Sequence, residues 1–241
     1  MAKKKRKKAR PSSGLSRVTA QKLVEGLPGP GGTRIRYAVP EEAAVVTDLL
    51  KTASEDLETG HLEALAEGRC GTWLRDALGS AQLTERLVRA AAAGELQAAA
   101  AALSLPLVAQ DRDGQLAGAL LSVPSGAIAG MASRLPGSMP YDLISMLKYA
   151  KIKALAVRED ARGRGTATAL LKRCVQIHWQ LDYLLLFGEF ETRRGLGPYY
   201  ERRGFTVLAP GGMLDIGTVL AGTPMRLGAQ PGETLFYRWR R

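Results

Sequence analysis

The sequence has little of what disulfide-bonded, metal-binding or membrane-spanning proteins need. Its 241 residues include two cysteines, Cys70 and Cys174, and two histidines. Cysteines this far apart, without the short spacing of metal ligands, exclude a disulfide framework and a zinc site. No apolar run reaches the roughly 18 residues of a spanning helix, and the basic N-terminus lacks the apolar segment of a secretion signal. We therefore expect a cytoplasmic protein without a membrane span.

Acidic residues are absent from the start of the chain, and this explains much of the formal net charge of +11. Seven lysines and arginines lie within residues 3–10, ahead of the first acid, Glu25. Residues 1–32, rich in Lys, Pro and Gly, are expected to form a disordered basic arm with a short helix over residues 16–26. Residues 3–10 could bind the phosphates of nucleic acid, of the ribosome or of an acidic membrane, or could be a solvated tail.

From residue 33 onward the pattern alternates between strands and helices, and 46% hydrophobic residues can fill one core. Strands are expected at residues 34–39, 105–110, 115–121, 152–157, 183–187, 205–208 and 235–239. Helices are expected at residues 40–50, 57–103 (two or three), 141–150, 167–178 and 198–203. Residues 210–233 are expected to form a long loop. Cys174 and His178 fall on the apolar face of their helix, which predicts that both lie in the core.

The chain is organised around residues 152–171. There an apolar strand is followed by the turn Arg162-Gly163-Arg164-Gly165 and then by a helix. The first N–H groups of a helix have no internal partner, and the helix dipole places partial positive charge beside them. Glycines allow another molecule to approach this backbone closely. The stretch therefore predicts a phosphate-binding turn.

A second motif follows the next expected strand, in the run Tyr200-Glu201-Arg202-Arg203-Gly204-Phe205. The spacing Arg162-x-x-Gly165-x-Ala167 resembles the acetyl-CoA pyrophosphate loop of GNAT acetyltransferases, and the second run resembles their Tyr-x-x-x-Gly-Phe segment. Each motif alone is weak, but the two occur in the family's order and spacing. The specific resemblance covers residues 152–205.

The resemblance implies acetyl-CoA as co-substrate and assigns its binding residues. The pyrophosphate would be held by backbone N–H groups of Arg164, Gly165, Thr166 and Ala167 in the turn that contains Gly163, with charge from Arg162 and Arg164. The pantetheine arm would pair with the backbone at the end of the strand, at Leu155, Ala156 and Val157, where it also helps to polarise the thioester carbonyl.

The resemblance also implies that Tyr200 protonates the departing CoA thiolate; otherwise it is an ordinary packing tyrosine. An attacking ammonium must lose a proton, and Glu189 or Glu191, at the end of the strand over residues 183–187, could accept it. Both carboxylates could equally be solvated or paired with a cation. Arg193 stands where the family often has Asn. This departure bears on how the loop contacts CoA and on whether catalysis is intact.

The implied architecture is the GNAT fold, an α/β (α+β) arrangement over residues 33–241. It has a mixed central sheet of six or seven strands, a splayed parallel central pair, helices on both faces and extra helices near the N-terminus. Two insertions are expected, a helical one at residues 57–103 and one at residues 123–150. The first could wall the acceptor site or simply pack on the sheet. The second could be a substrate lid carrying Met131, Met139 and Tyr141, or a surface insertion.

These observations predict an acetyl-CoA-dependent N-acetyltransferase that acts on a primary amine by direct attack in a ternary complex. A variant of this hypothesis exchanges acetyl for a longer acyl group. The alternative is a nucleic-acid- or ribosome-binding protein that works through residues 3–10 and carries a catalytically weak, CoA-binding GNAT module. The sequence allows a monomer or an oligomer.

Overall fold

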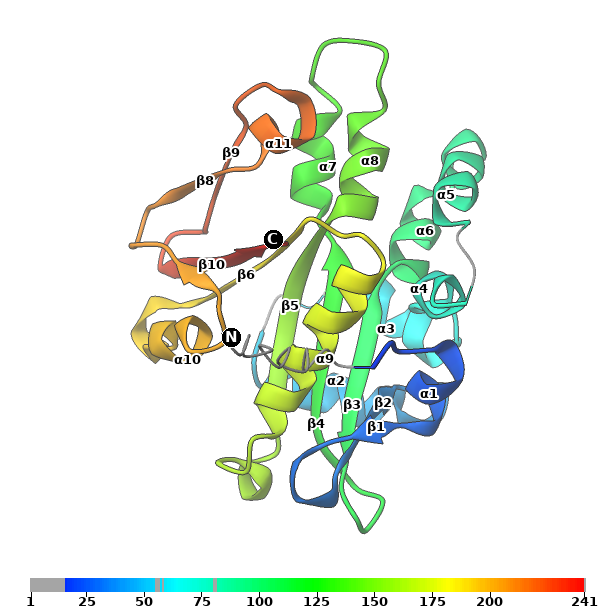
Figure 1. Ribbon diagram of the computed structural model, residues 1–241, viewed down its shortest axis with the longest axis vertical. Coiled ribbons are helices and arrows are strands. Elements are labelled where there is room, and N and C mark those ends of the chain that lie inside the picture. The colour runs from blue at the N-terminus through cyan, green and yellow to red at the C-terminus, as the bar shows by residue number, and fades with distance from the viewer. Residues whose placement is uncertain (1–15, 55–56, 58, 80–81, 241) are drawn as a thin grey trace, which may run out of the picture.

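The computed structural model describes residues 16–54, 57, 59–79 and 82–240. Within them an eight-stranded sheet has the order β1-β2-β3-β4-β5-β6-β10-β7, and β8 and β9 form a separate two-stranded sheet (Figure 1). The strands are β1 (Leu27–Pro28), β2 (Arg34–Tyr37), β3 (Leu105–Gln110), β4 (Leu116–Pro124), β5 (Tyr149–Val157), β6 (Leu185–Glu191), β7 (Thr206–Val207), β8 (Met213–Asp215), β9 (Arg226–Gly228) and β10 (Glu233–Trp239).

Neighbouring strands are antiparallel except for β5 and β6, which are parallel. The predicted mixed α/β sheet with a parallel central pair is therefore confirmed. It has one strand more than the upper estimate of seven, because the short β1 pairs with β2 through Leu27 and Ile35.

The helices cover both faces of the sheet (Figure 1). Their bounds are α1 (Ala20–Glu25), α2 (Ala43–Lys51), α3 (Thr59–Ala66), α4 (Thr72–Ala77), α5 (Leu83–Ala92), α6 (Leu96–Ala102), α7 (Gly126–Ala132), α8 (Tyr141–Lys148), α9 (Thr166–Gln180), α10 (Gly197–Glu201) and α11 (Gly217–Ala221). Short 3-10 turns lie at Pro30–Gly32, Pro40–Glu42, Glu159–Ala161 and Thr192–Arg194.

Alternate residues of β3 face opposite hydrophobic clusters, which separates the two layers. Leu107 packs in the cluster that contains α9 and α1 together with residues of α4, α5 and α6. Val108 packs instead with α2 and α3. The helical insertion at residues 57–103 thus supplies four helices, where two or three were expected, and they divide between the two faces.

The expected disordered arm over residues 1–32 is wrong for residues 16–32, although the short helix expected there is present as α1. Val18 and Leu23 are fully buried, and Leu27 is nearly so. These three apolar side chains pack in the main core. Their burial stabilises the segment, although its overall composition is poor in apolar residues. The basic residues 3–10 lie outside the described residues.

The expected long loop at residues 210–233 is also wrong, because it contains β8, α11 and β9. Leu214, Ile216 and Leu227 are buried there against Tyr149 and other residues of β5, β6 and β10. The Asp215 carboxylate accepts hydrogen bonds from three backbone N–H groups, those of Gly217, Thr218 and Met225. The many glycines and prolines of residues 210–233 are typical of a loop, so the sequence did not predict this small unit.

The insertion at residues 123–150 is a helical hairpin of α7 and α8, drawn at the top of Figure 1. Met131 and Tyr141 pack against the hydrophobic cluster to which the β8–β9 unit contributes. Met139 is exposed between the two helices. The lid remains a prediction.

Cys174 and His178 are buried, which confirms their expected core position. The His178 ring lies between two polar neighbours, with Nε2 3.4 Å from Ser122 Oγ and Nδ1 2.9 Å from the Cys174 carbonyl oxygen. Burial lowers the pKa of His178 to about 4, so the imidazole is neutral near pH 7. In the described ranges no helix has the length and apolar character needed to cross a bilayer.

Gly188 is a position where the sheet tolerates no side chain. A Cβ there would lie 2.5 Å from Phe236 Cζ and 2.9 Å from the Ile152 carbonyl oxygen. We expect Gly188→Ala to lower the free energy of unfolding by about 1–3 kcal/mol, as overpacking does elsewhere. Chemical denaturation measures the change.

Gly130→Ala in α7 is the matched control, because no atom lies within 4 Å of the added Cβ. Alanine should leave stability unchanged there or raise it by up to about 1 kcal/mol. Equal losses in the two variants would contradict the close approach at Gly188.

Candidate functional site

The parallel strands β5 and β6 are hydrogen-bonded at one end only. Their register runs from Tyr149 opposite Leu185 to Ile152 opposite Gly188. Beyond that pair, β5 continues beside β4 and β6 continues beside β10, but the two no longer pair with each other. The backbone of residues 153–157 therefore has one edge without a strand partner in the described chain. This is the splayed pair that the sequence predicted.

The uncapped N-terminus of α9 follows β5 directly. Its N-cap is Gly165, with φ of 86°, so no side chain caps the first-turn N–H groups. Arg162 Nε donates to the Val157 carbonyl oxygen at 3.2 Å and closes the turn against the end of β5. The arrangement brings the predicted residues of strand and loop together: Leu155, Ala156, Val157, Arg162, Gly163, Arg164, Gly165, Thr166 and Ala167.

The turn carries excess positive charge. Arg158 is paired with Asp160 at 2.6 Å and with Asp111 at 3.3 Å. Arg162 and Arg164 are exposed and form no salt bridge with a described residue, although Arg164 is close enough to Asp160 to help lower the pKa of that carboxyl. Free donors, a positive helix end and two available cations suit a phosphate.

The N-terminal segment runs along α9 and supports this turn, a feature that sequence reasoning missed. At the far end of the helix, the Gln180 side chain bonds both backbone groups of Val18, at 2.9 and 2.7 Å. Gln176 Nε2 donates to the Ser16 carbonyl oxygen. At the near end, Pro30 lies 3.6 Å from the Cβ position of Gly165. The signal was the spacing of Val18, Leu23 and Leu27, interrupted by polar residues.

Tyr200 lies in α10, surrounded by aromatic rings. Its ring stacks on Phe236 with centroids 3.6 Å apart, and Phe190 and Phe205 lie 5.7 and 5.9 Å away. Burial raises the pKa of the Tyr200 phenol well above its usual value. The phenol is therefore protonated across the physiological range, as a proton donor must be.

The neighbouring Tyr199 differs in its environment. Its hydroxyl is buried and makes no hydrogen bond of normal geometry with a described residue, although Thr168 is close enough to oppose the rise in its pKa. The Arg203 guanidinium lies over its ring, 3.6 Å from the centroid. Burial raises the pKa of Tyr199 as well.

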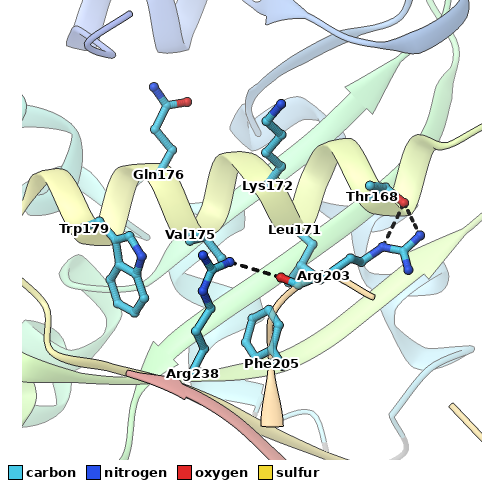
Figure 2. Close-up of a pocket in the computed structure, with 9 residues that line it drawn as sticks. All are labelled: Thr168, Leu171, Lys172, Val175, Gln176, Trp179, Arg203, Phe205 and Arg238. Carbon is cyan, nitrogen blue, oxygen red and sulfur yellow. Dashed lines mark hydrogen bonds between the residues drawn. The ribbon is translucent and has the colours of Figure 1, made fainter. Parts of the chain in front are cut away.

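An apolar groove of about 440 Å³ lies beside α9 (Figure 2). Arg203 closes the end nearest the phosphate turn, because its Nε and Nη2 donate to Thr168 Oγ1 at 2.9 and 2.5 Å. Arg238 Nη1 donates to the Arg203 carbonyl oxygen at 3.1 Å. The residues that line the groove are Thr168, Leu171, Lys172, Val175, Gln176, Trp179, Arg203, Phe205 and Arg238. Cations border an apolar floor there.

A larger polar cavity of about 1030 Å³ lies where β5 and β6 diverge. Its walls include Glu189, Glu191 and Lys153, together with residues 53–54 and 230–233. Glu189 is largely buried and pairs with Lys151 Nζ at 2.5 Å. Glu191 is more exposed and pairs with Arg193 at 2.5 Å, a hydrogen bond that lowers the pKa of Glu191.

In the described part of the chain, no cluster of three His, Cys, Asp or Glu side chains could hold a metal ion. The residues of the site could bind an anion at α9, donate a proton from a buried phenol and accept a proton at a carboxylate.

Residues 106–207, from β3 to β7, match the family model described as an acetyltransferase (GNAT) domain. The match includes both sequence motifs and confirms the family resemblance. No curated protein matches the chain.

The chain is similar to several solved structures of acetyltransferases. An acetyltransferase from Streptococcus agalactiae has a TM-score of 0.49 at 12% identity, covering 87% of this chain and 99% of that one. A GNAT-family acetyltransferase from Listeria monocytogenes has a TM-score of 0.46 at 15% identity, covering 88% and 99%. YncA from Salmonella typhimurium, solved with its cofactor acetyl-CoA, has a TM-score of 0.45 at 14% identity, covering 86% and 93%.

The first turn of α9 can be tested by charge. Ala167→Asp would place a carboxylate beside the uncapped N–H groups, which favours the free helix and repels a phosphate. We expect coenzyme A to bind at least tenfold more weakly to this variant, while its melting temperature without ligand stays equal or rises. Calorimetric titration and thermal unfolding measure the two effects.

Ala167→Asn is the control, since it matches aspartate in size without the charge. It should retain most of the affinity. Equal losses in both variants would mean that bulk, and not charge at the helix end, explains the result.

Proposed function

The segment from β3 to β7 is a GNAT acetyltransferase domain, and we propose that the chain uses it to transfer an acetyl group from acetyl-CoA directly to a primary amine. One observation carries the proposal. Pairing between β5 and β6 ends at Ile152 and Gly188, between the uncapped end of α9 and the polar cavity. Donor and acceptor could thus approach the same opening from two sides.

Acetyl-CoA supplies an activated thioester, and the chain's own residues would hold it and move protons. The N–H groups of the first turn of α9 would bind the pyrophosphate, with Arg162 and Arg164 adding charge. The unpaired edge of residues 155–157 would take the place of a strand partner for the pantetheine amides. Arg203 and Lys172, in the adjoining groove, add positive charge on the same side.

Two side chains would move the protons of the transfer. Glu189 would accept the proton of the attacking ammonium, directly or through a water, as the amide C–N bond forms and the thioester C–S bond breaks. Each carboxylate is paired with a cation at 2.5 Å, but Glu189 is favoured over Glu191 because its side chain is 11% accessible and that of Glu191 is 43% accessible. Tyr200 would give its proton to the departing sulfur.

Removal of one hydroxyl tests the proton donor. Tyr200→Phe keeps the stacked ring, so folding and coenzyme A affinity should be preserved while kcat falls about 100-fold or more, the usual contribution of a general acid. Free thiol release from acetyl-CoA in the presence of an accepted amine measures kcat.

Tyr199→Phe is the matched control in the same helix. Its hydroxyl makes no hydrogen bond of normal geometry with a described residue, so its removal should change stability little and leave kcat within about threefold. A larger loss in Tyr199→Phe than in Tyr200→Phe would move the proton donor by one residue and contradict the assignment.

The raised pKa of Tyr200 predicts the alkaline side of the pH profile. A donor must be protonated to act, and a pKa above the usual value of about 10 keeps Tyr200 protonated beyond pH 9. The value of kcat/KM should therefore rise with pH as the amine loses its proton. It should show no decrease at any pH up to 10. A descending limb centred near pH 8 would show that another group donates the proton.

A further inference from the structure

The two walls of the polar cavity carry opposite charge. Lys151 and Lys153 come from β5 and line one wall. Glu189 and Glu191 come from β6 and, with Glu233 of β10, line the other. The side-chain period of a strand is two residues, so the two members of each strand pair share a face of the sheet.

The positive wall has one uncompensated charge. Lys151 is neutralised by Glu189, with the two charged atoms 2.5 Å apart. Lys153 has no acidic partner within the described ranges. It is also the first residue of β5 beyond the last β5–β6 pair, at Ile152. A cation thus stands without a counter-charge at the point where the strands diverge.

The opposite wall is rich in carboxylates. Glu191 lies directly opposite Glu233 in the antiparallel register of β6 and β10. Arg193 pairs with Glu191 from a largely exposed side chain, 87% accessible. Glu189 lies deeper, with its side chain 11% accessible. Its carboxylate oxygens can accept hydrogen bonds from an ammonium group that enters the cavity.

We infer that the acceptor is a compact zwitterion, an amino acid or a similar aminocarboxylate, whose carboxylate binds at Lys153 and whose amine faces Glu189 and the glutamate wall. This inference rests on the proposed N-acetyltransferase activity and names the substrate class of its acceptor site. The lysine holds the carboxylate as a point charge on a flexible stem. A simple alkylamine would leave Lys153 uncompensated, and a polyamine would be repelled by it. The cavity, at about 1030 Å³, has room for a small molecule.

The test compares each amino acid with the amine that remains when its carboxylate is removed. Suitable pairs are phenylalanine with phenethylamine, leucine with isoamylamine, and arginine with agmatine. Thiol release from acetyl-CoA by the full-length protein gives KM for each. We expect at least one amino acid to be acetylated with a KM tenfold or more below that of its partner amine, since an added ion pair worth tenfold is about 1.4 kcal/mol.

Lys153→Met should reduce this preference towards unity, and Lys153→Arg should retain most of it. Lys51→Met, at an exposed position in α2, is the control for loss of a lysine and should keep the full preference. Equal or better use of the amines, a preference that survives Lys153→Met, or acetylation of peptides alone would overturn the inference.

A separate measurement distinguishes this failure from failure of the proposed function. Acetyl-CoA should raise the melting temperature of the protein by mass action whichever acceptor is used. If acetyl-CoA stabilises the protein and neither member of any pair is acetylated, the zwitterion inference is wrong while donor binding stands. If acetyl-CoA has no effect, the acetyltransferase function fails as well.

Discussion

The site depends on two parallel strands that stop pairing halfway along their length. Each strand keeps a second neighbour, β4 for β5 and β10 for β6, so the sheet remains continuous while its centre opens. The last bonded pair requires Gly188, because the Phe236 ring and the Ile152 carbonyl oxygen occupy the space of a side chain. Backbone N–H and C=O groups without a strand partner take their hydrogen bonds from elsewhere. The open edge of residues 153–157 and the uncapped end of α9 therefore offer donors and acceptors to water or to a ligand.

Helix α9 connects this opening to the N-terminal segment. Residues 16–30 follow the helix from Gln180 to Gly165, bound by glutamine side chains at one end and packed by Pro30 at the other. Such contacts fix the position of a helix end more firmly than propensity does. The basic residues 3–10 precede this segment in sequence.

The sequence predicted those parts of the fold whose signal is local. The turn at Arg162–Gly165 and the buried run that became β6 were readable from glycine placement and apolar periodicity, and the match of residues 106–207 supports the family they suggested. The β8–β9 unit and the ordered segment at residues 16–32 were not readable, because their stability comes from distant partners such as Tyr149 and α9. The arrangement of charges in the cavity could not be predicted from the sequence either, because it depends on the register that sets Glu191 opposite Glu233.

The environments of Tyr200 and Glu189 differ in the way that the two proton transfers of the proposed reaction need. The surroundings of Tyr200 are aromatic, and those of Glu189 are polar. Rings at 3.6, 5.7 and 5.9 Å bury the phenol and disfavour the phenolate, which raises the pKa of Tyr200. A thiolate leaving a thioester could take this proton only when it is desolvated, as it would be in this apolar cluster. Glu189, in contrast, forms an ion pair with Lys151 Nζ at 2.5 Å. In the proposed transfer, Tyr200 would give a proton and Glu189 would accept one, as direct transfer from thioester to amine requires.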